Sequence, residues 1–225
     1  MKGIKMTILD KYTKKDWTVE KLQLLTFDEC LELFKALAPP EFEELNGEYK
    51  ADLLGGDTEM GEWLMHKEVL GYWLGKAYTP TPSAKRSRFK GEGYNFWLID
   101  GKKVYHSRFA THMSVSEIDE KPIFRMQYDV FKSLYGQQGM VDEIRKLKTG
   151  LYLCWGKHWP TQPGGPFCLS GPQEPYNKDP EWYYGDEISN PVKVKYSFKE
   201  YPYPDTMNTK EFKAFWKDHW SEKIS

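Results

Sequence analysis

Apolar residues recur at helical spacing near the start of the chain. Thr26 and Glu29 stand three residues apart, the pattern of a capping box that opens a helix. The apolar stripe that follows consists of Cys30, Leu31, Phe34 and Leu37. Two consecutive prolines at positions 39 and 40 end this helix, because proline breaks the helical hydrogen-bond ladder. We therefore predict a helical N-terminal segment over residues 1–45.

Beyond residue 46 the pattern changes to short alternating segments, which are typical of strands. Asp100 and Gly101 give a strong tight-turn signal between two of them. The gaps are too short for the crossover helices of a parallel sheet, so the pattern favours an antiparallel barrel or sandwich over residues 46–170. The predicted strands are 47–54, 71–78, 94–99, 104–115, 123–130, 140–147, 150–155 and 166–169, and 59–70 fits a short helix at least as well as a strand.

The last part of the chain, residues 171–225, is rich in Pro, Tyr and Asp and is predicted to wrap the barrel irregularly. One further strand is expected at 192–197. Asn208 can cap a closing helix at 208–220, whose apolar stripe consists of Phe212, Phe215, Trp216 and Trp220. The three segments together predict one domain over residues 1–225.

Composition narrows the class of protein. The 225 residues include 32 Lys and Arg against 33 Asp and Glu, so the net charge of −1 gives no global reason to expect a nucleic-acid partner. An aromatic fraction of 16% argues against disorder. The apolar runs are too short for a membrane span, and the first residues contain no apolar stretch typical of a secretory signal. We therefore predict a cytoplasmic protein.

The thiol and imidazole groups carry no metal signature. Cys30, Cys154 and Cys168 are widely spaced and form no CxxC pair, which argues against a disulfide framework and a zinc site. The five histidines form no HExxH or HxH motif. We expect neither a metal nor a cofactor.

The stretch Leu33–Ala51 resembles the GxWxG family of lipocalin-like proteins, because a helix ending at proline leads into the strand Gly47-Glu48-Tyr49-Lys50-Ala51. Tyr49 and Ala51 stand where the family has Trp and the second Gly. The literal motif occurs at Gly71-Tyr72-Trp73-Leu74-Gly75. Three later segments are similar to the strands of the family's companion C-terminal region, namely 123–128, 141–145 and 150–153. The resemblance covers roughly residues 26–170.

This resemblance implies an antiparallel lipocalin-like (calycin) β-barrel with a small hydrophobic ligand, and it implies no catalytic residues. Our strand and helix predictions add an N-terminal helical segment and a C-terminal helix. A closed barrel of about eight strands can hold one small ligand, and each strand contributes every second side chain to the interior.

Strict alternation along Val104–Val115 leaves two interpretations open. In the first, the interior face consists of Tyr105, Ser107, Phe109, Thr111 and Met113. In the second, His106, Arg108 and His112 face a polar cavity; a bulge would change both assignments. His112 is of interest because imidazole exchanges protons near neutral pH.

Two other segments supply candidate site residues. On 123–130, Phe124, Met126 and Tyr128 share an apolar face, with Arg125 on the other. Tyr128 would be a hydrogen-bond donor or acid on an otherwise apolar wall. On 150–160, the side chains of Trp155, His158 and Trp159 could line a barrel mouth.

Three functions follow from these residues. The first is binding of a small hydrophobic or aromatic molecule by Trp73, Tyr94, Trp97, His106, Phe109, Met126, Trp155, His158 and Trp159. The second is a cofactor-independent isomerase, cyclase or dehydratase acting on such a molecule. In it His112 or Tyr128 transfers the proton and Arg108 or Arg125 stabilises developing negative charge. The third is a protein-interaction module that uses the aromatic C-terminal region.

Overall fold

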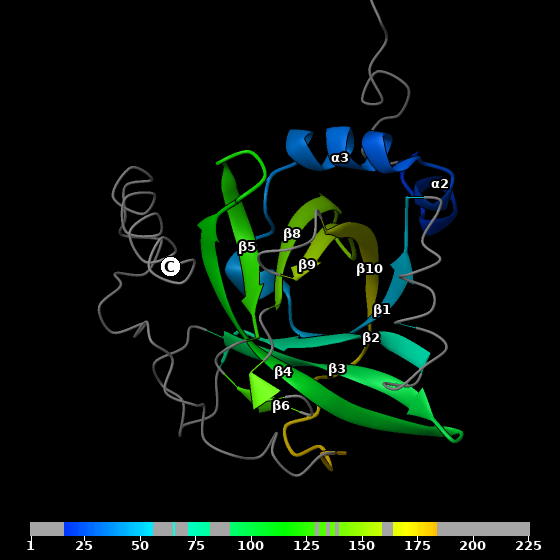
Figure 1. The fold of residues 1–225 in the computed structure, drawn as a ribbon, viewed down its shortest axis with the longest axis vertical. Coiled ribbons are helices and arrows are strands. Elements are labelled where there is room, and N and C mark those ends of the chain that lie inside the picture. The colour runs from blue at the N-terminus through cyan, green and yellow to red at the C-terminus, as the bar shows by residue number, and fades with distance from the viewer. Residues whose placement is uncertain are drawn as a thin grey trace, which may run out of the picture.

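Eight antiparallel strands close into a barrel in the order β1-β10-β9-β8-β5-β4-β3-β2 (Figure 1). The computed structural model describes residues 16–55, 65, 72–81, 91–128, 131–133, 136–137, 140–158 and 164–183. The predicted antiparallel barrel is thus confirmed. Its strands are β1 Gly47–Leu53, β2 Tyr72–Thr79, β3 Gly91–Ile99, β4 Lys102–Val115, β5 Pro122–Gln127, β8 Met140–Lys148, β9 Leu151–His158 and β10 Gly165–Glu174.

A short hairpin, β6 Lys132–Ser133 with β7 Gly136–Gln137, is separate from the barrel sheet. The predicted turn between β3 and β4 is also confirmed, and Asp100 and Gly101 both have positive φ angles of 49° and 74°. The predicted strand 192–197 and helix 208–220 lie outside the described residues, as does all of 59–70 except Met65.

Two helices, α2 Val19–Gln23 and α3 Phe27–Ala36, lie against the outside of the barrel (Figure 1). Their apolar faces pack on outward-facing residues of the strands, among them Leu151, Leu153 and Trp155 of β9. The Arg145 guanidinium, on the outer face of β8, donates to the carbonyl of Phe34 at 2.8 Å and is paired with Asp119. The helices therefore form a second apolar core outside the barrel wall.

A capping box begins α3. The Thr26 hydroxyl accepts from the backbone N–H of Glu29 at 3.3 Å, and the Glu29 carboxylate accepts from the backbone N–H of Thr26 at 3.0 Å. Thr26→Ala is expected to lower the free energy of unfolding by about 1 kcal/mol, because the backbone N–H of Glu29 loses the hydroxyl oxygen that accepts its hydrogen bond. Urea unfolding measures this loss. Thr26→Ser should behave like the parent, and equal losses in both variants would contradict the capping role.

One end of the barrel is closed by the short 3-10 helix η2 Phe42–Glu44. The Phe42 ring stacks on Phe124 with centroids 5.5 Å apart, and Leu45 joins the same interior cluster. The Tyr152 hydroxyl donates to the Glu44 carboxylate at 2.9 Å. We call this the η2 end. At the opposite end of the barrel β2 and β4 begin and β3 ends. The side chains that lie toward that opposite end are Trp73, Trp97 and His106.

A bulge in β4 settles which side chains of this strand face inward. The register with β3 shifts between the pairs Gly93↔Phe109 and Asn95↔His106, and Ser107 has a φ of 56°. His106 and Phe109 consequently both face the interior, although they are an odd number of residues apart. Neither strict alternation predicted from the sequence describes the whole strand.

Candidate functional site

Four polar side chains meet inside the barrel, and we call them the interior polar cluster: Lys76, Asn95, Tyr128 and Asp142. The Lys76 ammonium donates to Asn95 Oδ1 at 2.7 Å and to the Tyr128 hydroxyl oxygen at 2.5 Å. It also pairs with Asp142 Oδ2 at 2.9 Å. An ammonium has three N–H donors, so this arrangement satisfies all of them.

The remaining groups of the cluster are oriented by each other. Tyr128 donates its hydroxyl proton to Asp142 Oδ2 at 2.8 Å. The Asn95 amide donates to the carbonyl of Ser107 at 2.9 Å, at the bulge in β4, and to the Tyr128 hydroxyl at 3.3 Å. The bulge thus helps to hold Asn95 so that its side-chain oxygen faces the ammonium.

The cluster is enclosed by aromatic rings. The side chains of Lys76 and Asp142 are only 3% and 2% exposed. The rings around the Lys76 ammonium have centroids 5.0–5.6 Å from it and belong to Trp73, Phe109, Tyr128 and Phe167. A charge removed from water is costly unless it is paired, and here both the carboxylate and the ring faces stabilise the cation.

Burial also shifts the proton affinities of the cluster. Desolvation lowers the pKa of Lys76 below its ordinary value, and Asp142 opposes that shift. Burial and the negative charge of Asp142 raise the pKa of Tyr128 well above its ordinary value. Tyr128 therefore stays protonated at neutral pH and acts as a hydrogen-bond donor. The Cys154 thiol has a pKa raised by burial as well, which argues against a nucleophilic role.

Three aromatic rings fill the barrel interior between the interior polar cluster and the end opposite η2. Trp73 and Trp97 have centroids 6.3 Å apart, and the His106 imidazole stacks on Trp97 at 4.9 Å with an interplanar angle of 7°. The Trp97 indole N–H is buried, and among the described residues it has no hydrogen-bond acceptor. The Trp73 indole N–H differs, since it donates to Gly75 O at 3.0 Å and to Asn95 Oδ1 at 3.1 Å.

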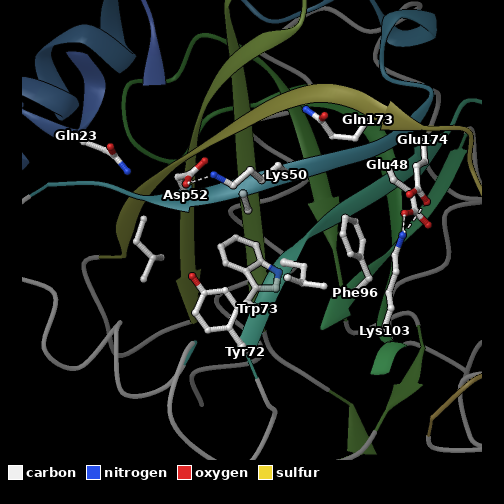
Figure 2. Close-up of a pocket in the computed structure, with 13 residues that line it drawn as sticks. Gln23, Glu48, Lys50, Asp52, Tyr72, Trp73, Phe96, Lys103, Gln173 and Glu174 are labelled. Carbon is white, nitrogen blue, oxygen red and sulfur yellow. Dashed lines mark hydrogen bonds and ion pairs between the residues drawn. The ribbon is translucent and has the colours of Figure 1, made fainter. Parts of the chain in front are cut away.

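A groove of about 750 Å³ opens in the barrel wall between β1 and β2 (Figure 2). The pairing of these two strands ends at Lys50↔Gly75, so 51–53 and 72–74 face each other without a ladder. Trp73 lines this groove while its N–H bonds Asn95, so one indole connects the groove to the interior polar cluster. The groove is lined by Gln23, Glu48, Lys50, Ala51, Asp52, Leu53, Tyr72, Trp73, Leu74, Phe96, Lys103, Gln173 and Glu174.

The residues that the sequence proposed for ligand binding divide between the two sides of the wall. Those in the interior core are Trp73, Trp97, Phe109 and Met126, with His106 stacked on Trp97. Tyr94 lies outside, where it packs on Tyr176 and donates to Glu48 at 2.9 Å. Trp155 also lies outside, because its ring packs under α3 against Phe34. The side chain of His158 and the residue Trp159 lie outside the described part of the chain.

Of the residues proposed for catalysis, Tyr128 alone lies in the interior. Arg108 pairs with Glu92 and lies between the rings of Phe131 and Trp182. Arg125 pairs with Glu117, and His112 lies opposite Arg125 in the β4–β5 register. These three side chains point outward because their strand neighbours Phe109 and Met126 point inward. An acid–base reaction inside the barrel therefore cannot use them.

The environment of His112 predicts a pH dependence of stability. Burial and the nearby Arg125 lower the pKa of His112 to about 3, below the value of an unfolded histidine. The unfolded chain then binds a proton that the folded chain does not, so stability is present above about pH 6.5 and is lost as the pH falls. We expect a loss of about 2 kcal/mol at pH 5.

Unfolding by urea between pH 7 and pH 4 measures this effect. His112→Gln removes the titrating group and should flatten the pH dependence. If the stability of His112→Gln falls with pH as steeply as that of the parent, the loss of stability at low pH is not due to His112.

Sequence reasoning missed Lys76, Asn95 and Asp142. The signal that could have found them is a charged or amide side chain within a segment whose neighbours are apolar and aromatic, as for Lys76 in Tyr72–Tyr78. Such a residue has to be paired when the strand is buried on both faces. The pairing itself joins β2, β3, the residue that follows β5, and β8. These segments are far apart in the sequence, so no local pattern predicts it.

The fold and site together define a closed eight-stranded antiparallel barrel with a charged pair in its interior. No protein-family model and no curated protein matches the chain. A crystal structure of a protein from Thermomonospora curvata is similar over 62% of this chain and 82% of that chain, with 17% identity and a TM-score of 0.44. The resemblance to the GxWxG family stays a prediction.

Two structural findings concern metals and membranes. The described residues contain no group of three His, Cys, Asp or Glu side chains placed to hold a metal ion. None of the described helices has the length and apolar character needed to cross a membrane.

Proposed function

We propose that the protein binds a small aromatic or hydrophobic molecule that carries a hydrogen-bond acceptor, inside the barrel at the end opposite η2. The single observation that carries this proposal is the buried N–H of Trp97, which has no acceptor among the described residues and lies beside the rings of Trp73 and His106. A buried donor without an acceptor costs about 1–3 kcal/mol, and a ligand oxygen would remove that cost. Flat neighbouring rings suit an aromatic ligand.

An enzyme is the second candidate, and the chemistry of the interior polar cluster favours it. Burial lowers the pKa of the Lys76 ammonium, and Tyr128 is a protonated donor 2.8 Å from a carboxylate oxygen of Asp142. Groups with shifted proton affinities in a closed site are typical of acid–base catalysis. In such an isomerase, cyclase or dehydratase the Lys76 ammonium, whose pKa is lowered, would be the acid, and the Tyr128 hydroxyl would orient the substrate by a hydrogen bond. No cofactor would be needed.

The binding proposal is tested with two ligands of similar shape, 2-acetylnaphthalene, which has an acceptor oxygen, and 2-ethylnaphthalene, which has none. Quenching of tryptophan fluorescence reports their affinities. Replacing Trp97 with benzothienylalanine keeps the ring shape and removes the N–H. We expect this replacement to weaken acetylnaphthalene binding about tenfold, as the loss of one hydrogen bond predicts, and to leave ethylnaphthalene binding unchanged.

The matched control carries benzothienylalanine at Trp155, which is buried outside the barrel. It should bind both ligands as the parent does. Failure of the parent to bind either ligand, or equal weakening of both by the Trp97 replacement, would count against the proposal. Native mass spectrometry of the purified protein separates binder from enzyme: a retained compound returned unaltered supports binding, and one whose conversion is abolished by Tyr128→Phe supports catalysis.

A further inference from the structure

The groove between β1 and β2 has a composition that favours one class of ligand. Three carboxylates line it, from Glu48, Asp52 and Glu174, against two ammonium groups, from Lys50 and Lys103. Both ammonium groups are already paired, since Lys50 bonds Asp52 and Lys103 pairs with Glu48 and Glu174. The groove therefore has an excess of negative charge and a free capacity for a cation.

The chain itself shows how a cation sits in this groove. The Lys103 ammonium lies over the Phe96 ring at 4.8 Å and over the Tyr105 ring at 5.8 Å. It bonds Glu174 at 2.9 Å and also bonds Glu48. An alkylammonium held between carboxylates on an aromatic face is the arrangement that recognises organic amines in proteins.

The other half of the groove also combines a carboxylate with aromatic rings, from Asp52, Tyr72 and Trp73. Asp52 Oδ1 accepts from Lys50 at 2.8 Å, whereas Asp52 Oδ2 is buried and has no hydrogen-bond partner among the described residues. Figure 2 shows Asp52 on β1 across from the rings of Tyr72 and Trp73 on β2. Tyr72 is 49% exposed, so its ring is accessible from solvent.

We propose that this half of the groove binds a small organic ammonium ion, with its nitrogen on Asp52 Oδ2 and its apolar part on the rings of Tyr72 and Trp73. A carboxylate ligand would meet three carboxylates and two ammonium groups that are already neutralised. A neutral hydroxyl could donate to Asp52 Oδ2, but it would leave the excess negative charge of the groove uncompensated. Trp73 contributes to both this groove and the site proposed for the interior. The inference does not rest on an interior ligand, because the group that recognises the ammonium ion is Asp52, which is not part of the interior core.

Three probes of similar size test the proposal: phenethylammonium, the neutral 2-phenylethanol and the anion phenylacetate. Isothermal titration calorimetry at low salt should detect phenethylammonium as the tightest binder. Asp52→Asn should weaken its binding roughly fivefold to tenfold, since a partly buried charge pair is lost. Lys50→Gln should strengthen it by a similar factor, because a competing cation is removed from the same carboxylate. The two variants thus shift affinity in opposite directions.

Glu32→Gln is the matched control, since it removes one carboxylate on the exposed part of α3 and should leave the affinity unchanged. The proposal is overturned if phenylethanol or phenylacetate binds as tightly as phenethylammonium, or if none of the probes binds. It is also overturned if Asp52→Asn and Lys50→Gln change the affinity in the same direction.

Discussion

Asp142→Ala is expected to lower the free energy of unfolding by about 3–5 kcal/mol, the cost of leaving one partner of a buried ion pair uncompensated. Lys76 would lose its carboxylate and keep an environment of aromatic rings. Burial already lowers the pKa of Lys76, and the loss of Asp142 removes the main group that counteracts that shift. The variant should therefore be least stable at low pH and should regain stability as the pH rises and Lys76 loses its proton.

Urea unfolding of a double-mutant cycle measures this effect. The cycle consists of Lys76→Met, Asp142→Leu and the double variant, which replaces both charges by apolar side chains and should be considerably more stable than the single variant Asp142→Leu. A double variant as unstable as the sum of its single variants would show that the two side chains do not interact. A loss below about 1 kcal/mol in Asp142→Ala, as for an exposed pair, would contradict the buried pairing.

Gly75→Ala is expected to cost about 3 kcal/mol or more. A Cβ at this position would lie 1.9 Å from the backbone oxygen of Tyr49, a contact that neither strand can relieve by a side-chain rotation. Gly75 pairs with Lys50 at the last position where β1 and β2 are joined. The substitution would therefore separate the two strands that close the barrel.

Gly165→Ala is the matched control, since a Cβ there meets no atom within 4 Å. It should change the free energy of unfolding by less than about 0.5 kcal/mol, as is usual for an uncrowded surface position. Thermal unfolding of the two variants side by side provides the comparison. Similar melting temperatures for both would show that β1 and β2 approach less closely than described.

The barrel was predictable because its strands show local signals. Alternating side chains, the Asp100–Gly101 turn and the short gaps between segments are each contained within a few residues. The bulge at Ser107 was not predictable in position, because a single residue in a left-handed conformation shifts the inward face and leaves the composition unchanged. For that reason His106 and Arg108, which strict alternation places on one face, lie on opposite sides of the wall.

The candidate site was predictable in its aromatic part only. Rings such as Trp73 and Phe109 fit an apolar interior, so their inclusion required no knowledge of partners. Lys76 and Asp142 are 66 residues apart in the chain, and only barrel closure brings them to 2.9 Å. The outward assignment of Trp155 depends on α3, which covers that part of β9 with its own apolar face. The local sequence pattern therefore cannot predict which distant residues pair, nor which strand face a helix covers.

The shared position of Trp73 has a thermodynamic consequence. Its ring forms part of the groove on one side of the wall, and its N–H bonds the Asn95 oxygen that also accepts from Lys76 on the other. An occupant of the groove that moves this indole would alter the hydrogen bonds of the interior. Any such linkage is reciprocal, so a molecule in the interior would change affinity in the groove by the same factor. Binding in the groove and binding in the interior would then be energetically coupled through the barrel wall.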